Sequence, residues 1–223
     1  MKSGKFNKKF WKRAVFCALG VIVSAFSVGL FKLAEFGVDP FQSLMVGLDM
    51  WIPMDFGTLY VVVNAVLLIF SLVTDRHYVG LGTFVNLFLT GYIADFSHKT
   101  LMGIFPGIGL GGRIVSLLIG IVIMCFAAAI YFAADMGVST YDAVALIFDN
   151  KFHLGRFKII RIVTDTICVA LGVVLFFLCG GKLSGIGAVA GVGTIVTAFF
   201  MGPLIDFFRR TVADPLMGYQ PRE

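Results

Sequence analysis

The segment GLGTFVNLFLTGYIADF, residues 80–96, recurs as GVGTIVTAFFMGPLIDF, residues 191–207, with eight of seventeen positions identical. A second match without gaps joins residues 13–49 to residues 113–149 at an offset of 100. A period near 100 residues is far longer than the roughly 20–50 residues of solenoid repeats. The pattern therefore predicts a duplicated half-protein, with repeat one over about 13–97 and repeat two over about 113–208.

The composition is that of a membrane protein. Of the 223 residues, 59% are hydrophobic and only 14% are charged. Apolar runs of about 20 residues are typical of membrane-spanning helices. One membrane domain therefore fills residues 1–223, and no soluble catalytic domain fits, so an enzyme is not predicted. Six spans are predicted at roughly 14–36, 57–74, 79–97, 113–134, 157–179 and 185–207.

The basic residues set the expected orientation. If the N-terminus is cytoplasmic, only Lys32, Lys99, Arg113 and Lys182 of the 18 Lys and Arg residues face outward. The positive-inside rule then places both termini in the cytoplasm, with residues 1–12 and 209–223 as tails. Membrane orientation accounts for the net charge of +5, and nucleic acid is not predicted as a partner.

Three spans per repeat have a structural consequence. Because three is odd, the first helix of repeat two must cross the membrane in the opposite direction to the first helix of repeat one. The sequence thus predicts an all-α membrane protein of six transmembrane helices, arranged as two inverted three-helix repeats.

A short helix is expected after the first span of each repeat, in GVDPFQSLMVGLDMWIPMDFG (37–57) and GVSTYDAVALIFDNKFHLG (137–155). Gly37 and Gly137 can end the preceding helices. Asp39 followed by Pro40, and Ser139 in the second repeat, are typical helix starts. About ten residues follow in each case, up to Asp49 and Asp149.

Two placements fit these short helices, because each is too short to span the membrane and too apolar for a loop in water. Each lies in the membrane interface, or each enters the protein as a broken or re-entrant helix. A buried helix N-terminus would offer free amide donors to an anion or a carboxylate.

Candidate site residues come first from matched positions. Gln42 and Asp142 share an offset of 100 on the short helices, and Asn64 matches Asp165 at an offset of 101 in the spans. Acidic side chains inside a membrane are costly, so each one is first considered as a candidate functional residue. For each position a plainer alternative stays open: Asp165 pairs locally with Arg161, Asn64 bridges two helices, and Gln42 and Asp142 are ordinary first-turn polar residues.

Two further candidates come from differences between the repeats. Asn86 belongs to a polar stripe with Thr83, Thr90 and Ser97, and the matching segment of repeat two has fewer polar residues. The alternative interpretation of this stripe is hydrogen bonding between helices. Asp39 has no acidic counterpart, because Ser139 takes its place. The three histidines fall in predicted loops and the four cysteines in predicted spans. No metal and no cofactor are therefore predicted.

These segments also carry a family resemblance. GVDPFQSLMVGL (37–48), GVSTYDAVALIF (137–148) and the two GxGT…G…DF segments resemble the YitT/YczE-like family of bacterial integral membrane proteins. The resemblance implies a six-helix protein of the inner membrane. It implies no accepted substrate and no catalytic residues.

Two functions follow from these observations. The first is a secondary transporter or permease for a small solute, with its site between the repeats. The second is a non-transporting accessory, sensor or substrate-capturing subunit that needs a partner. The expected partners are membrane lipid and a small molecule, with a second copy or a partner subunit as further possibilities.

Overall fold

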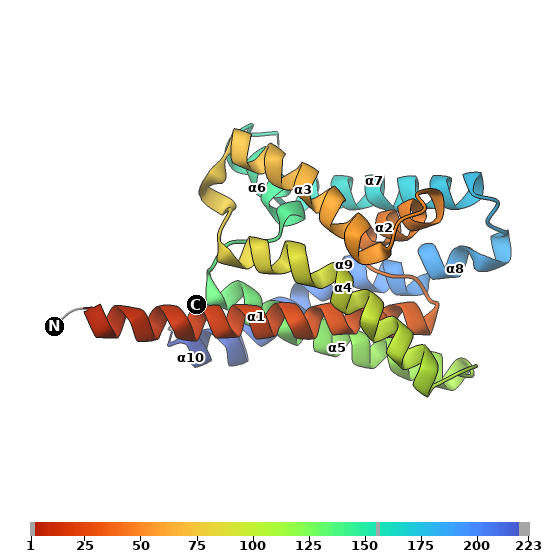
Figure 1. The fold of residues 1–223 in the computed structure, drawn as a ribbon, viewed down its shortest axis with the longest axis horizontal. Helices are drawn as coiled ribbons and strands as arrows, with labels where there is room; N and C mark the ends of the chain where they lie inside the picture. The colour runs from red at the N-terminus through yellow and green to blue at the C-terminus, as the bar shows by residue number, and fades with distance from the viewer. Residues whose placement is uncertain (1–2, 155–156, 219–223) are drawn as a thin grey trace.

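The computed structural model describes residues 3–154 and 157–218, which are helical with no strand among them (Figure 1). Single turns η1 (Arg76–Tyr78) and η2 (Leu183–Gly185) and a π-helical turn η3 (Arg209–Ala213) join some of the helices. Four helices are short: α2 (Pro40–Trp51), α6 (Thr140–Asn150), α8 (Ile186–Val189) and α10 (Asp214–Met217). The long helices are α1 (Ser3–Ala34), α3 (Phe56–Thr74), α4 (Leu81–Ile104), α5 (Leu110–Ala134), α7 (Phe157–Leu178) and α9 (Val192–Phe208).

Five segments of the described chain are long and apolar enough to cross a membrane. They are Lys9–Ala34, Phe56–Thr74, Leu110–Ala134, Ile159–Leu178 and Leu183–Met217.

Helix α4 is less apolar than these five, yet it exposes its apolar side. Phe84, Phe88 and Phe96 are exposed, whereas Thr83 and Thr90 are buried. This is the reverse of a helix on a water-soluble protein, whose polar side faces outward. The outer surface of α4 therefore suits lipid.

Helices α1 and α5 pack antiparallel along their lengths, and matched residues exchange contacts. Arg13, about three turns into α1, lies 3.9 Å from Asp135 just after α5, and Arg113 in the first turn of α5 lies 2.9 Å from Glu35 just after α1. Each Arg therefore pairs with the acid of the other repeat. Such exchange is what a two-fold relation between two like elements produces.

The repeated GxGT segments make a second reciprocal contact. The amide of Gly82 donates to the carbonyl of Met136 at 2.7 Å, and the amide of Gly193 donates to the carbonyl of Phe36 at 2.6 Å. A Cβ added at Gly80 would overlap the Met136 carbonyl. The glycines recur because each repeat brings backbone against the turn that follows the first long helix of the other.

The ends of α1 and α5 differ from the expectation that Gly37 and Gly137 terminate them. The helices end at Ala34 and Ala134, and Glu35 (φ 54°) and Asp135 (φ 52°) adopt the left-handed conformation that ends a helix. Gly37 (φ 95°) serves another purpose, because a Cβ there would lie 2.5 Å from the amide nitrogen of Gly191. The glycine permits close approach of two backbones.

The C-terminal part differs from the prediction in two ways. The predicted sixth span is interrupted at Ala190 and Gly191, so α8 and α9 are separate helices. Residues 209–217, expected as part of a tail, continue as η3 and α10 and pack on α5 through Ala213. The Nζ of Lys12 donates to the carbonyl of Leu216 at 2.8 Å, so the described beginning and end of the chain lie at the same end of the bundle.

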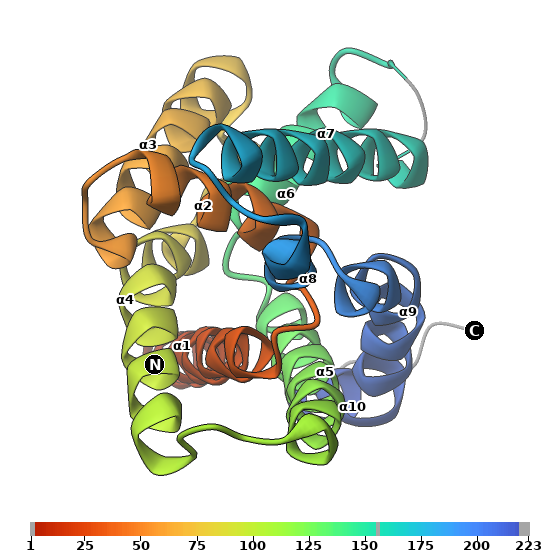
Figure 2. The ribbon, with the colours of Figure 1, turned by 90° about the vertical axis from the view of Figure 1, so that its right-hand side faces the viewer.

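The short helices form as predicted, starting at Pro40 and Thr140. They lie between α3 and α7 on one side and α1 and α5 on the other (Figure 2). Phe41 and Met45 of α2 are buried in a core cluster with Tyr60 of α3. The first turns of α2 and α6 therefore face the interior of the bundle.

Candidate functional site

A cavity of about 190 Å³ lies where the two repeats meet. Both repeats line it, through residues of α1 to α7 and α9. Five of the six candidate residues line this cavity: Asp39, Gln42, Asn64, Asn86 and Asp142. The sixth, Asp165, lies beside it and lines a second cavity of about 340 Å³, mainly apolar, between α7 and α9.

The N-termini of α2 and α6 both meet the first cavity, and each has a first-turn amide bonded to the side chain that caps it. The amide of Gln42 donates to the carboxylate of Asp39 at 3.2 Å, and Pro40 has no N–H. In α6 the amide of Asp142 donates to Ser139 Oγ at 3.1 Å, and that hydroxyl donates to Asp142 Oδ2 at 2.7 Å. The expectation of free amide donors for an anion is therefore wrong for α2, because the Asp39 carboxylate occupies its positive end.

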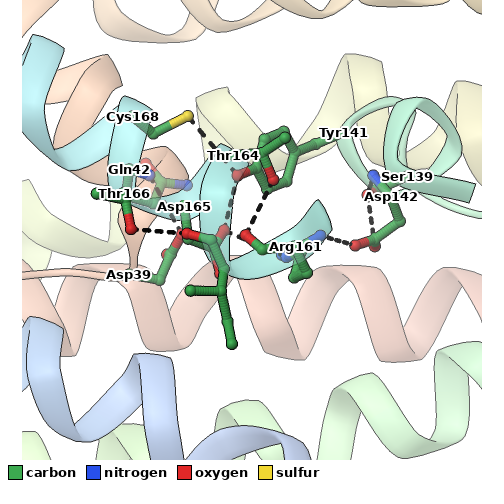
Figure 3. Close-up of polar contacts among 11 residues, drawn as sticks. Asp39, Gln42, Ser139, Tyr141, Asp142, Arg161, Thr164, Asp165, Thr166 and Cys168 are labelled. Carbon is green, nitrogen blue, oxygen red and sulfur yellow. Dashed lines mark hydrogen bonds and ion pairs between the residues drawn. The ribbon is translucent and has the colours of Figure 1, made fainter. Parts of the chain in front are cut away.

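Arg161 of α7 organises the charges of the site (Figure 3). Its Nη1 pairs with Asp142 Oδ1, and its Nε lies 3.2 Å from Asp165 Oδ1. Its guanidinium stacks 4.3 Å from the ring centre of Tyr141, whose hydroxyl donates to Asp165 Oδ1 at 2.6 Å. The local Arg161–Asp165 pair is present, but Arg161 also reaches inward to α6 and joins two carboxylates.

Asn64 bridges two helices through both ends of its amide. Its Nδ2 donates to the carbonyl of Tyr60 at 2.8 Å, and its Oδ1 accepts from Thr140 Oγ1 at 2.5 Å. Asn64 is 1% exposed. These contacts fit the helix-bridging interpretation and leave its polar atoms occupied.

Three buried polar atoms on the cavity wall have no hydrogen-bond partner among the described residues. They are Oε1 of Gln42, Oγ1 of Thr90 and the hydroxyl oxygen of Tyr131. Gln42 is 3% exposed and Tyr131 is 5% exposed. An unpaired buried polar group costs about 1–3 kcal/mol, so these atoms suit a partner that enters the cavity.

Sequence reasoning missed several residues of this site: Arg161, Tyr60, Tyr131 and Tyr141. Comparing the repeats carries a signal for two of them. Tyr131 matches Phe31 and Tyr141 matches Phe41 at the offset of 100, so only repeat two has the hydroxyl groups. The sequence indicates Arg161 only as the local partner of Asp165, because its contact with Asp142 depends on how α6 packs against α7.

The fold and cavity define a multi-pass helical membrane protein with a polar, charged site between two similar halves. Residues 11–210 match the model of a family of unknown function, DUF6198. The chain belongs to that family.

Curated relatives extend over nearly the whole chain. An uncharacterized protein of Haemophilus influenzae is 26% identical over 206 residues, covering 90% of this chain and 87% of its own. The uncharacterized membrane protein YczE of Bacillus subtilis is 23% identical, covering 87% and 84%. YyaS, an uncharacterized protein of the same organism, is 24% identical, covering 87% and 90%. The resemblance to a YczE-like family is thus confirmed. No solved structure matches the chain.

Proposed function

We propose that this protein is a secondary transporter for a small solute, and that the cavity between the repeats is its binding site. The observation that carries the proposal is the set of buried, unpartnered polar atoms on Gln42, Thr90 and Tyr131 in a cavity lined by both repeats. Sites of this kind, at the junction of inverted repeats and beside broken helices, are typical of transporters. The proposed role is non-enzymatic.

The proposed topology has six spans in two inverted repeats, in the inner membrane with both termini cytoplasmic. The reciprocal Arg13–Asp135 and Arg113–Glu35 pairs support a two-fold relation between the repeats. The contact of Lys12 with Leu216 supports termini on one side, which requires an even number of crossings. Helix α4, with its exposed aromatic side chains, supplies the sixth crossing in addition to the five apolar segments.

Helices α2 and α6 act as re-entrant helices in this proposal. Their first turns line the cavity, while Trp51 at the end of α2 and Phe152 just after α6 are exposed. Tryptophan is typical of the membrane interface. Rocking of one repeat against the other would open the cavity alternately to each side.

Uptake by reconstituted protein tests this proposal while the solute is still unidentified. Liposomes containing the purified full chain are incubated with a mixture of small metabolites, and mass spectrometry identifies those that accumulate relative to empty liposomes. We expect accumulation of at least one solute, with an initial rate at least about tenfold lower for Gln42→Ala because a buried polar contact to the solute is lost. Asn150→Ala is the matched control, because it removes an exposed amide outside the cavity.

Three results decide the outcome. Accumulation that Gln42→Ala abolishes and Asn150→Ala preserves supports transport through this cavity. Accumulation that both variants preserve contradicts the placement of the site. Stabilisation of the chain by a solute that it never moves contradicts transport and favours a substrate-capturing subunit that needs a partner.

A further inference from the structure

The cavity wall carries more acidic than basic side chains. The guanidinium of Arg161 is bound by the carboxylates of Asp142 and Asp165, so its charge is already matched. Asp39 also lines the cavity, and among the described residues no Lys or Arg lies within ion-pair distance of it. A compensating positive group stabilises an ionised carboxylate in a bundle of apolar helices.

Hydrogen-bond acceptors line the same cavity as this carboxylate. The carbonyl oxygen of Gln42, one turn further along α2, is buried and lacks a donor. The Tyr131 hydroxyl of α5 also lacks a partner and can accept. A ligand that carries several N–H donors would satisfy both oxygen atoms.

Aromatic rings form part of the same wall. Phe41 stacks on Tyr141 with ring centres 4.9 Å apart and makes a T-shaped contact with Tyr60 at 5.9 Å, and all three residues line the cavity. Aromatic faces attract ammonium and guanidinium groups, most strongly where water is excluded. The wall therefore combines a carboxylate, acceptor oxygens and aromatic rings, of which Tyr141 already holds the guanidinium of Arg161.

We propose that the cavity selects a small organic cation with N–H donors, a primary ammonium or a guanidinium, with Asp39 as its counter-ion. This inference rests on the proposed transport function and specifies the class of solute. The carboxylate at the start of α2 disfavours an anion there, both by repulsion and because it already occupies the positive end of the helix. Gln42 and Tyr131 would accept hydrogen bonds from the cation.

Thermal unfolding of the purified full chain with probes of matched size tests the proposal. The probes are butylammonium and butylguanidinium as cations, butyrate as the anion and butyramide as the neutral compound, at equal ionic strength. A thiol-reactive dye reports unfolding, because Cys17, Cys125 and Cys168 are buried in the folded protein. We expect a saturating cation to raise the midpoint by about 3 °C or more, and butyrate and butyramide to leave it unchanged.

Two variants locate the effect. Asp39→Asn should remove the shift while the chain still folds, because Asn caps a helix start as well as Asp does. Asp49→Asn removes a carboxylate from the same helix but outside the cavity, and it should keep the full shift. An unchanged shift in Asp39→Asn would overturn the assignment of the counter-ion.

The remaining outcomes separate this inference from the proposed function. Stabilisation by butyrate or butyramide that Gln42→Ala removes overturns the cation class but keeps the cavity as a binding site. No stabilisation by either cation, together with Gln42-dependent uptake from the metabolite mixture, overturns the cation class and leaves transport standing. Absence of both effects overturns both proposals.

Discussion

At the scale of single residues, residues that are identical at aligned positions of the two repeats have different structural roles. Gly91 of α4 and Gly202 of α9 align in the repeated segment. A Cβ at Gly91 would lie 2.5 Å from the Cβ of Tyr60 and 3.0 Å from the Cα of Gly57. A Cβ at Gly202 would meet no heavy atom within 4 Å among the described residues beyond its chain neighbours and the backbone of its own helix. Close packing therefore requires glycine at Gly91 and does not require it at Gly202.

This difference predicts unequal effects of the same substitution on stability. Gly91→Ala should lower the free energy of unfolding by about 1–3 kcal/mol, because neither the Tyr60 Cβ nor the backbone of α3 can move aside easily. Gly202→Ala should change stability by no more than about 1 kcal/mol, because the preference of alanine for a helix interior is opposed by the proline that follows at position 203. Denaturant unfolding in detergent measures both. Equal destabilisation by the two variants would contradict this account of the repeat.

At the scale of secondary-structure elements, the sequence predicted what local signals determine. The bounds of α3, α5 and α7 lie within three residues of the predicted spans, because a span is recognised by the length of its apolar run. The start of α2 was predicted because Asp39 followed by Pro40 is a local capping signal. The link from Arg161 to Asp142 on α6 could not be predicted, since it depends on how α6 and α7 pack.

The Arg161 cluster predicts a large effect of one cation on stability. Arg161→Met should lower the free energy of unfolding by about 2–4 kcal/mol, because Asp142 and Asp165 would stay in the bundle without a positive partner. The Arg161 side chain is 32% exposed, which keeps the effect below that of a fully buried pair.

Arg210→Met is the matched control for the Arg161 variant. Arg210 also pairs with an acid four residues away, Asp206, but both side chains are more than half exposed. Its removal should change stability by no more than about 0.5 kcal/mol. The same unfolding assay compares the two variants, and equal losses would show that the Arg161 cluster adds nothing beyond a surface ion pair.

At the scale of the whole molecule, the relation between the repeats fails where the cavity lies. Thr140, the first residue of α6, donates to Asn64 of α3 at 2.5 Å. The matched residue of α2 is Pro40, which has no side-chain donor, and it lines the same apolar cavity as Asp165 of α7. Asp165 instead accepts from Tyr141 and Arg161. The contacts between α1 and α5 and those of the two GxGT segments are thus reciprocal between the repeats, whereas the polar contacts around the cavity differ. The charged cluster of Arg161, Asp142 and Asp165 therefore lies on one side of the cavity.

The proposed topology can be tested by labelling the outer ends of the short helices. In a Cys179→Ser background the remaining cysteines are buried, so an added cysteine alone reacts with a maleimide that cannot cross membranes. The parent side chains are exposed at both positions, by 63% at Trp51 and by 48% at Phe152. Trp51→Cys should react in intact cells, whereas Phe152→Cys should react only in inverted vesicles. The reason is that two inverted repeats place the ends of α2 and α6 on opposite faces of the membrane.

Trp11→Cys, in the N-terminal part of α1, is the control for the cytoplasmic face and should be labelled under the same conditions as Phe152→Cys. Labelling of positions 51 and 152 from the same side would contradict the inverted arrangement, whatever solute the cavity binds.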